Sequence, residues 1–182
     1  TVQDHGQYRI LAEGGAVDSS MPAPEQVTVT FPLKIEGIEV IEDGGYPHGI
    51  QVGVSVRDNR VMSVYGLNAQ TYSSSAYPLE TSSERILSIA GKGGVNVWTP
   101  QPEDGMQIKN VDLEIGTPKK VLMHTYNYSG NESKELYVPA LSFPVTKTPG
   151  EKDQYYPKEI IIPLTTDLLN ARRPEIRYDL VR

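Results

Sequence analysis

The chain has 182 residues, a formal net charge of −6 and no cysteine, with 38% hydrophobic and 22% charged residues. These totals are typical of a soluble folded domain and exclude a disordered tail, a membrane span, disulfides and thiolate chemistry. The acidic balance argues against nucleic acid as a partner, because Lys and Arg must neutralise its phosphates. We therefore predict a single β-rich domain over residues 1–182, with two small lobes as the alternative.

Residues 1–25 contain a loop rich in Gly, Ser and Pro and are predicted to form an irregular N-terminal segment. From Gln26 to Glu36, apolar and polar residues alternate, which predicts a strand with one face on a core and one face in water. Further alternating runs and the turn signal Asp58-Asn59 follow. Residues 26–66 are therefore interpreted as a three-stranded antiparallel meander.

A short helix is predicted over residues 81–91. Thr81-Ser82-Ser83-Glu84 has the pattern of a capping box, in which the Thr hydroxyl and the Glu carboxylate each accept a hydrogen bond from a backbone N–H group. Gly91 and the glycines after it end the helix. Residues 106–146 are predicted to form strands and a hairpin, and residues 171–182 a solvated C-terminal arm.

Together these elements predict the α+β class. The expected architecture is a mainly antiparallel, twisted β-sheet with one or two short helices packed on one face.

The chemistry-bearing residues predict no catalytic centre. None of the histidines (His5, His48 and His124) has a second ligand at metal spacing or lies in a nucleophile motif. The serine run from Ser73 to Ser75 lacks the glycines of a nucleophile elbow. A non-enzyme is therefore predicted, with no metal and no cofactor.

Tyrosine is abundant, with 11 residues against two Phe and one Trp. A Tyr ring can be buried while its hydroxyl stays in water, which suits half-exposed sheet faces and binding surfaces alike. If an aromatic binding surface exists, the predicted candidates lie in the connecting segments: Tyr72, Tyr77, Trp98, Tyr155 and Tyr156. The alternative is that these rings cover the core.

A longer pattern is more informative than any single motif. It comprises the strand Phe31 to Val40, the strand Arg60 to Tyr65, the helix-opening segment Tyr77 to Ile86, and the later strands Ile108 to Ile115 and Glu135 to Phe143. This order resembles the extracytoplasmic regulatory domains of the YycH/YycI type, which associate with membrane histidine kinases, and more loosely PepSY-like domains. The resemblance covers about residues 27–145 and implies no catalytic residues.

The resemblance implies a non-enzymatic extracytoplasmic module that modulates a membrane-bound partner. The chain begins at Thr1, so a signal peptide or an N-terminal anchor is expected to have been removed, which would leave a soluble piece outside the membrane. Two alternatives remain open. One is a secreted structural or adhesive β-domain that self-associates through edge strands, and the other is a hydrolase or a carbohydrate-binding domain.

Overall fold

A computed structural model describes residues 2–3, 25–95, 112–129, 132–148 and 157–171. These residues form ten strands and two helices, so the predicted α+β class is confirmed. The contacts divide the chain into two compact units. The first unit is Thr1–Val40 with Pro47–Ser74, and the second unit is Ile41–Tyr46 with Ser75–Arg182.

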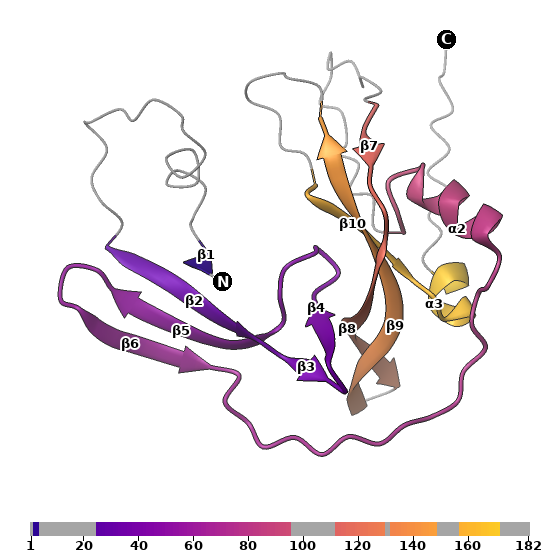
Figure 1. Cartoon of the computed structure of the whole chain (residues 1–182). Helices are drawn as coiled ribbons and strands as arrows, with labels where there is room; N and C mark the ends of the chain where they lie inside the picture. The colour runs from indigo at the N-terminus through magenta and orange to yellow at the C-terminus, as the bar shows by residue number, and fades with distance from the viewer. Residues whose placement is uncertain (1, 4–24, 96–111, 130–131, 149–156, 172–182) are drawn as a thin grey trace, which may run out of the picture. The chain divides into compact units, whose positions relative to one another are not determined.

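The first unit contains a four-stranded antiparallel sheet in the order β1-β2-β5-β6 (Figure 1). Its strands are β1 (Val2–Gln3), β2 (Gln26–Pro32), β5 (Gly49–Ser55) and β6 (Arg60–Tyr65). The predicted meander is present as β2, β5 and β6, but the chain inserts a small hairpin between β2 and β5. This hairpin consists of β3 (Lys34–Ile35) and β4 (Ile38–Ile41), whose last residue belongs to the second unit.

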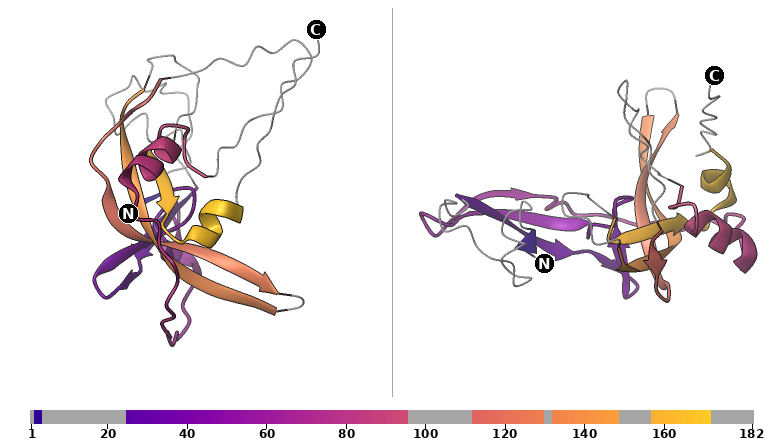
Figure 2. Two further views of the ribbon diagram at one scale, coloured as in Figure 1. Left: turned by 90° about the vertical axis from the view of Figure 1, so that its right-hand side faces the viewer. Right: turned by 90° about the horizontal axis from the view of Figure 1, so that it is seen from above.

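In the second unit, β8 (Lys119–Ser129) and β9 (Glu132–Lys147) form a long antiparallel hairpin. Strand β10 (Glu159–Pro163) pairs with the middle of β9, and β7 (Glu114–Ile115) pairs with its end. Because β10 pairs only with residues 140–144, the far half of the hairpin extends beyond it (Figure 2). The predicted strands and hairpin within residues 106–146 are thus found between Glu114 and Lys147; residues 106–111 lie outside the described part.

Two apolar clusters form the core of the second unit, one on each face of its sheet. One cluster contains Val121, Met123, Val138, Ala140 and Ile161, together with Ile41, and the other contains Phe143, Ile160 and Ile162 with residues of both helices. Successive side chains of a strand point to opposite faces, so Ile161 packs in the first cluster and Ile160 and Ile162 pack in the second. This explains why the run Ile160 to Ile162 shows no alternation of apolar and polar residues.

The helices are α2 (Ser83–Ala90) and α3 (Thr166–Ala171), and both lie beside β10 (Figure 1). Ile86 and Ala90 of α2 and Leu169 of α3 pack into the cluster around Phe143. The expectation of short helices on one sheet face is therefore confirmed. Of the predicted C-terminal arm, Ala171 ends α3, and residues 172–182 lie outside the described part.

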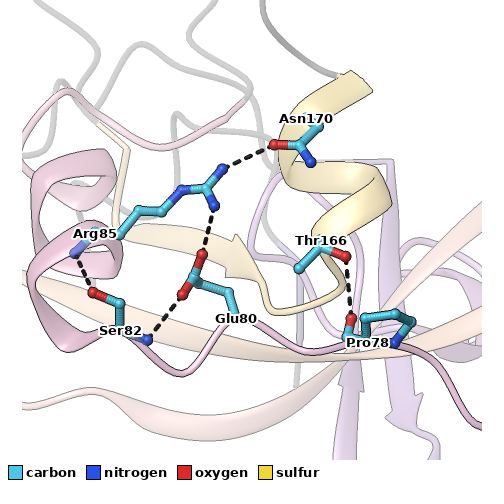
Figure 3. A network of polar contacts seen from close by, with 6 residues as sticks. All are labelled: Pro78, Glu80, Ser82, Arg85, Thr166 and Asn170. Carbon is cyan, nitrogen blue, oxygen red and sulfur yellow. Dashed lines mark hydrogen bonds and ion pairs between the residues drawn. The ribbon is translucent and has the colours of Figure 1, made fainter.

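The N-terminus of α2 corrects the predicted capping box. Ser82, rather than Thr81, is the N-cap, and its Oγ accepts a hydrogen bond from the Arg85 backbone N–H. The carboxylate that reaches a backbone N–H is Glu80, which accepts from Ser82, and not Glu84 (Figure 3). The helix therefore begins two residues later than predicted. The later start has a tertiary cause. The Glu80 backbone N–H donates a hydrogen bond to the Leu164 carbonyl, and this bond fixes the chain just before the helix.

Arg85 joins this cap to the second helix. Its Nη1 lies 2.6 Å from Glu80 Oε2, and its Nη2 donates to Asn170 Oδ1 of α3 at 2.8 Å (Figure 3). The Ser82 backbone hydrogen bond is the largest influence that holds the pKa of Glu80 below its ordinary value of 4.5, and the charge of Arg85 acts in the same direction. The ionised carboxylate is thus the form that stabilises this corner of the fold.

We expect Glu80→Gln to lower the stability of the second unit at neutral pH and to have little effect in acid. A carboxyl group whose pKa is depressed on folding contributes stability above its unfolded pKa, and this contribution is lost as the pH falls through the folded pKa. Thermal unfolding followed by circular dichroism from about pH 7 to about pH 3 measures the gap between wild type and variant. A gap that keeps its size in acid would show that the charge of Glu80 is not the cause.

Candidate functional site

Three tyrosines and a histidine lie on one face of the β8–β9 hairpin. The strand register places His124 opposite Tyr137, Tyr126 opposite Glu135, and Tyr128 opposite Ser133. Partners in register share a face, and so do residues two apart, so all six side chains belong to the same face. We call His124, Tyr126, Tyr128, Glu135 and Tyr137 the aromatic face.

The rings of this face follow one another toward the tip of the hairpin. The centroids of the His124 and Tyr126 rings are 4.9 Å apart in an edge-to-face arrangement, and those of Tyr126 and Tyr128 are 6.1 Å apart. The centroid of the Tyr137 ring lies 5.5 Å from that of His124. The buried end of the row is His124, whereas Tyr126 is 49% and Tyr128 74% exposed. The outer two rings are therefore open to a ligand.

Two carboxylates flank the imidazole ring of His124. Its Nδ1 lies 3.0 Å from Glu42 Oε2, and its Nε2 lies 3.0 Å from Glu135 Oε1. The second contact has the distance of an ion pair but not the angle of a hydrogen bond. Glu135 Oε1 also accepts a hydrogen bond of 2.7 Å from the Tyr137 hydroxyl. The imidazole and the Tyr137 hydroxyl thus hold the carboxylate of Glu135 beside the exposed rings.

Glu42 is brought to this face by a tight turn. Its backbone N–H donates to the Tyr46 carbonyl at 2.7 Å, and its carbonyl accepts from the Gly45 N–H at 2.9 Å. Gly45 has a φ of 80°, a conformation that favours glycine, as the Asp43-Gly44-Gly45 sequence indicates. Ile41, the preceding residue, is anchored in the core cluster with Val121 and Met123. Adjacent residues of an extended chain point to opposite sides, so Glu42 reaches the aromatic face.

The electrostatic environment of this face is acidic. Burial is the first cause that raises the pKa of Tyr126, and the charges of Glu135 and Glu42 add to it. The phenol therefore stays protonated to a higher pH than an ordinary tyrosine. Together with the overall charge of −6, the two carboxylates make this face attractive to cations rather than anions.

Glu42 and His124 also offer the kinds of donor atom that a zinc-type ion accepts, a carboxylate oxygen and an imidazole nitrogen. In the structure these two atoms contact each other.

The tyrosines that the sequence singled out lie elsewhere. Tyr72 belongs to the first unit and Tyr77 to the second, and they are 46% and 54% exposed. Tyr72 donates its hydroxyl to Gln70 beside it. Trp98, Tyr155 and Tyr156 lie outside the described residues. The aromatic face was missed, although His124, Tyr126 and Tyr128 recur at the period of two that marks one face of a strand.

No protein-family model matches the chain, and comparisons with curated proteins and with solved structures found no match. The YycH/YycI-type resemblance therefore stays a prediction. Among the described residues, neither helix has the length and apolar character needed to cross a membrane.

Proposed function

We propose that this chain is a non-enzymatic, extracytoplasmic binding module that takes a basic segment of a membrane-bound protein partner on the aromatic face. The observation that carries the proposal is the pair of exposed rings, Tyr126 and Tyr128, beside the carboxylates of Glu135 and Glu42. The extracytoplasmic location and the membrane-bound partner rest on the family resemblance over about residues 27–145.

A Lys or Arg side chain suits this surface for two physical reasons. A cation over the face of a tyrosine ring is attracted by the ring quadrupole, which contributes about 0.5–1 kcal/mol at an exposed site. Arg in addition makes paired hydrogen bonds with a carboxylate. Glu135 is positioned for this role because the His124 ring and the Tyr137 hydroxyl hold one of its oxygens in place.

A carbohydrate is the second candidate ligand for the same face. The adjacent exposed rings of Tyr126 and Tyr128 could stack on the apolar face of a sugar, with Glu135 accepting hydrogen bonds from its hydroxyls. A sugar gains hydrogen bonds from these carboxylates, but a cation gains these bonds and in addition the attraction of its full charge to Glu42 and Glu135. The basic segment is therefore the better fit.

Tyr128→Ala is expected to weaken the binding of a hexa-arginine peptide by about 3- to 10-fold, because one exposed cation–π contact and its buried area are lost. The binding is measured by isothermal titration calorimetry at low salt, where exposed charges are least screened. Tyr77→Ala is the matched control, because this tyrosine of the same unit is 54% exposed but lies outside the aromatic face. The control should bind as wild type does.

A peptide of the same length with citrulline in place of arginine tests whether binding depends on the positive charge. Citrulline keeps the shape of the side chain but removes its charge, so its binding should fall. Equal affinity for both peptides, or equal effects of Tyr128→Ala and Tyr77→Ala, would overturn the proposal. Specific hits on a glycan array that Tyr128→Ala abolishes would favour the carbohydrate instead.

A further inference from the structure

Strands β2, β5 and β6 of the first unit share a face on which only apolar side chains lie. Register partners point to the same side, so Val27, Val29 and Phe31 of β2 share a face with their partners Val54, Val52 and Ile50 of β5. The partners of Val52 and Val54 on β6 are Val64 and Val61. We call these eight residues the apolar face; its members are Val27, Val29, Phe31, Ile50, Val52, Val54, Val61 and Val64.

A β-bulge extends this face onto β6. Val61 and Val64 are three residues apart, so in a regular strand they would point to opposite sides. The register between β5 and β6 shifts so that Ser63 pairs with Gly53 and Val61 with Val54, which leaves Met62 as the extra residue. The bulge therefore turns both valines to the same side.

The apolar face is incompletely buried. None of its eight members is fully buried, and Phe31, Val61 and Val64 are 58%, 59% and 47% exposed. On the polar face, Thr30 and Ser55 are 1% and 7% exposed. Among the described residues of the first unit, Val40 is the one fully buried hydrophobic side chain, and it lies outside this sheet. A sheet needs a second layer on its apolar face to be stable.

We propose that a second copy of this chain supplies that layer, with the two apolar faces packed against each other as a β-sandwich about a twofold axis. No member of the face is charged, so its partner is another apolar surface. A twofold axis guarantees that each copy presents the same face to the other. Side chains of two such sheets interdigitate across about 10 Å.

The sizes of the side chains fit this symmetry. The large residues Phe31 and Ile50 lie at one end of the face, and the smaller Val27, Val54 and Val61 lie at the other. A twofold axis that runs between the sheets and across the strands places the large end of one copy on the small end of the other. The layer between the sheets then has an even thickness, as a close-packed core requires.

The area is sufficient for a specific dimer. Strands β2, β5 and β6 have seven, seven and six residues. At about 3.3 Å per residue and 4.8 Å between strands, they span roughly 300 Å² of flat sheet, and the projecting side chains increase the accessible area. Two such faces together cover roughly 600 Å² of flat sheet, and their projecting side chains bring the buried area near the roughly 1,000 Å² that a specific interface needs.

The test is analytical ultracentrifugation of the full chain, wild type and variants, with circular dichroism to verify folding. Wild type should sediment as a dimer, and Val61→Asp should raise the dimer dissociation constant at least about 100-fold, because it places an unpaired carboxylate in the interface. Tyr65→Asp is the matched control, since Tyr65 is 66% exposed on the same strand but pairs with Gln51 of the polar face. The control should remain dimeric.

A cysteine variant keeps the test decisive if Val61→Asp fails to fold. The chain has no cysteine, so Val52→Cys introduces a single thiol at the middle of the apolar face. On mild oxidation it should form a disulfide-linked dimer, whereas Tyr65→Cys should not. A monomeric wild type would overturn the proposal and indicate that another segment of the chain or a different protein covers the face. Dissociation by Tyr65→Asp as well would overturn it in favour of edge pairing.

Discussion

Phe143→Ala is expected to destabilise the second unit by about 3–5 kcal/mol, the range for deleting a buried aromatic ring. The Phe143 side chain is 2% exposed and packs in one cluster with Ile86 of α2, Ile160 and Ile162 of β10, and Leu169 of α3. Removing the ring takes away the common contact of both helices and β10. Because folded domains are stable by only about 5–15 kcal/mol, we expect a large fraction of the second unit to unfold at modest denaturant concentration.

The measurement is urea unfolding followed by circular dichroism, with Leu87→Ala as the matched control. Leu87 lies on α2 but is 55% exposed, so its truncation removes little buried area. The control should shift the free energy of unfolding by less than about 0.5 kcal/mol, as surface substitutions do. Similar losses for both variants would contradict the assignment of Phe143 to the core.

His124→Ala is expected to lower the free energy of unfolding by about 2–3 kcal/mol, the scale of hydrogen bonds to charged groups. The imidazole is 5% exposed, contacts Glu42 and Glu135, and packs against the rings of Tyr126 and Tyr137. Its removal leaves a cavity and takes away the group between two carboxylates. The expected loss of unfolding free energy is no larger because Glu42 and Glu135 are 42% and 35% exposed, so solvent screens their charges.

A double-mutant cycle isolates the contact between His124 and Glu42. Glu42→Gln and His124→Ala are measured singly and together by chemical unfolding. Residues in direct contact should show a coupling free energy of at least about 0.5 kcal/mol. Additive effects would indicate that the imidazole stabilises the hairpin through packing with Tyr126 and Tyr137 alone. In either case His124→Ala should also weaken peptide binding, because His124 positions Glu135.

The two proposals concern different units and can fail separately. Binding of a basic peptide depends on the aromatic face of the second unit, and dimerisation depends on the apolar face of the first. Tyr128→Ala should therefore leave the sedimentation behaviour unchanged. Val61→Asp should leave the intrinsic affinity for the hexa-arginine peptide unchanged, provided that the variant is folded.

The local elements could be predicted from the sequence because their signals are local. Alternation identified β2, the hairpin predicted within residues 106–146 corresponds to β8 and β9, and the glycines from Gly91 onward marked the end of α2. The cap of α2 was misplaced because the choice between Thr81 and Ser82 depends on a hydrogen bond between Glu80 and Leu164, which is 84 residues away. A pattern of neighbouring residues contains no information about such a contact.

The candidate site depended on pairing between distant segments. The sequence showed three histidines without neighbouring ligands, but the fold places Glu42 and Glu135 on either side of His124, at sequence separations that no motif search covers. What the sequence by itself determined is a β-rich α+β chain whose strands have distinct apolar and polar faces. Only the tertiary structure decided which faces are buried, because burial depends on which other layer covers a face. The alternation in β2 predicted a core face, yet none of the apolar side chains on that face is fully buried, whereas Thr30 on the opposite face is 1% exposed. The layer that would cover the apolar face is not encoded in the strand itself.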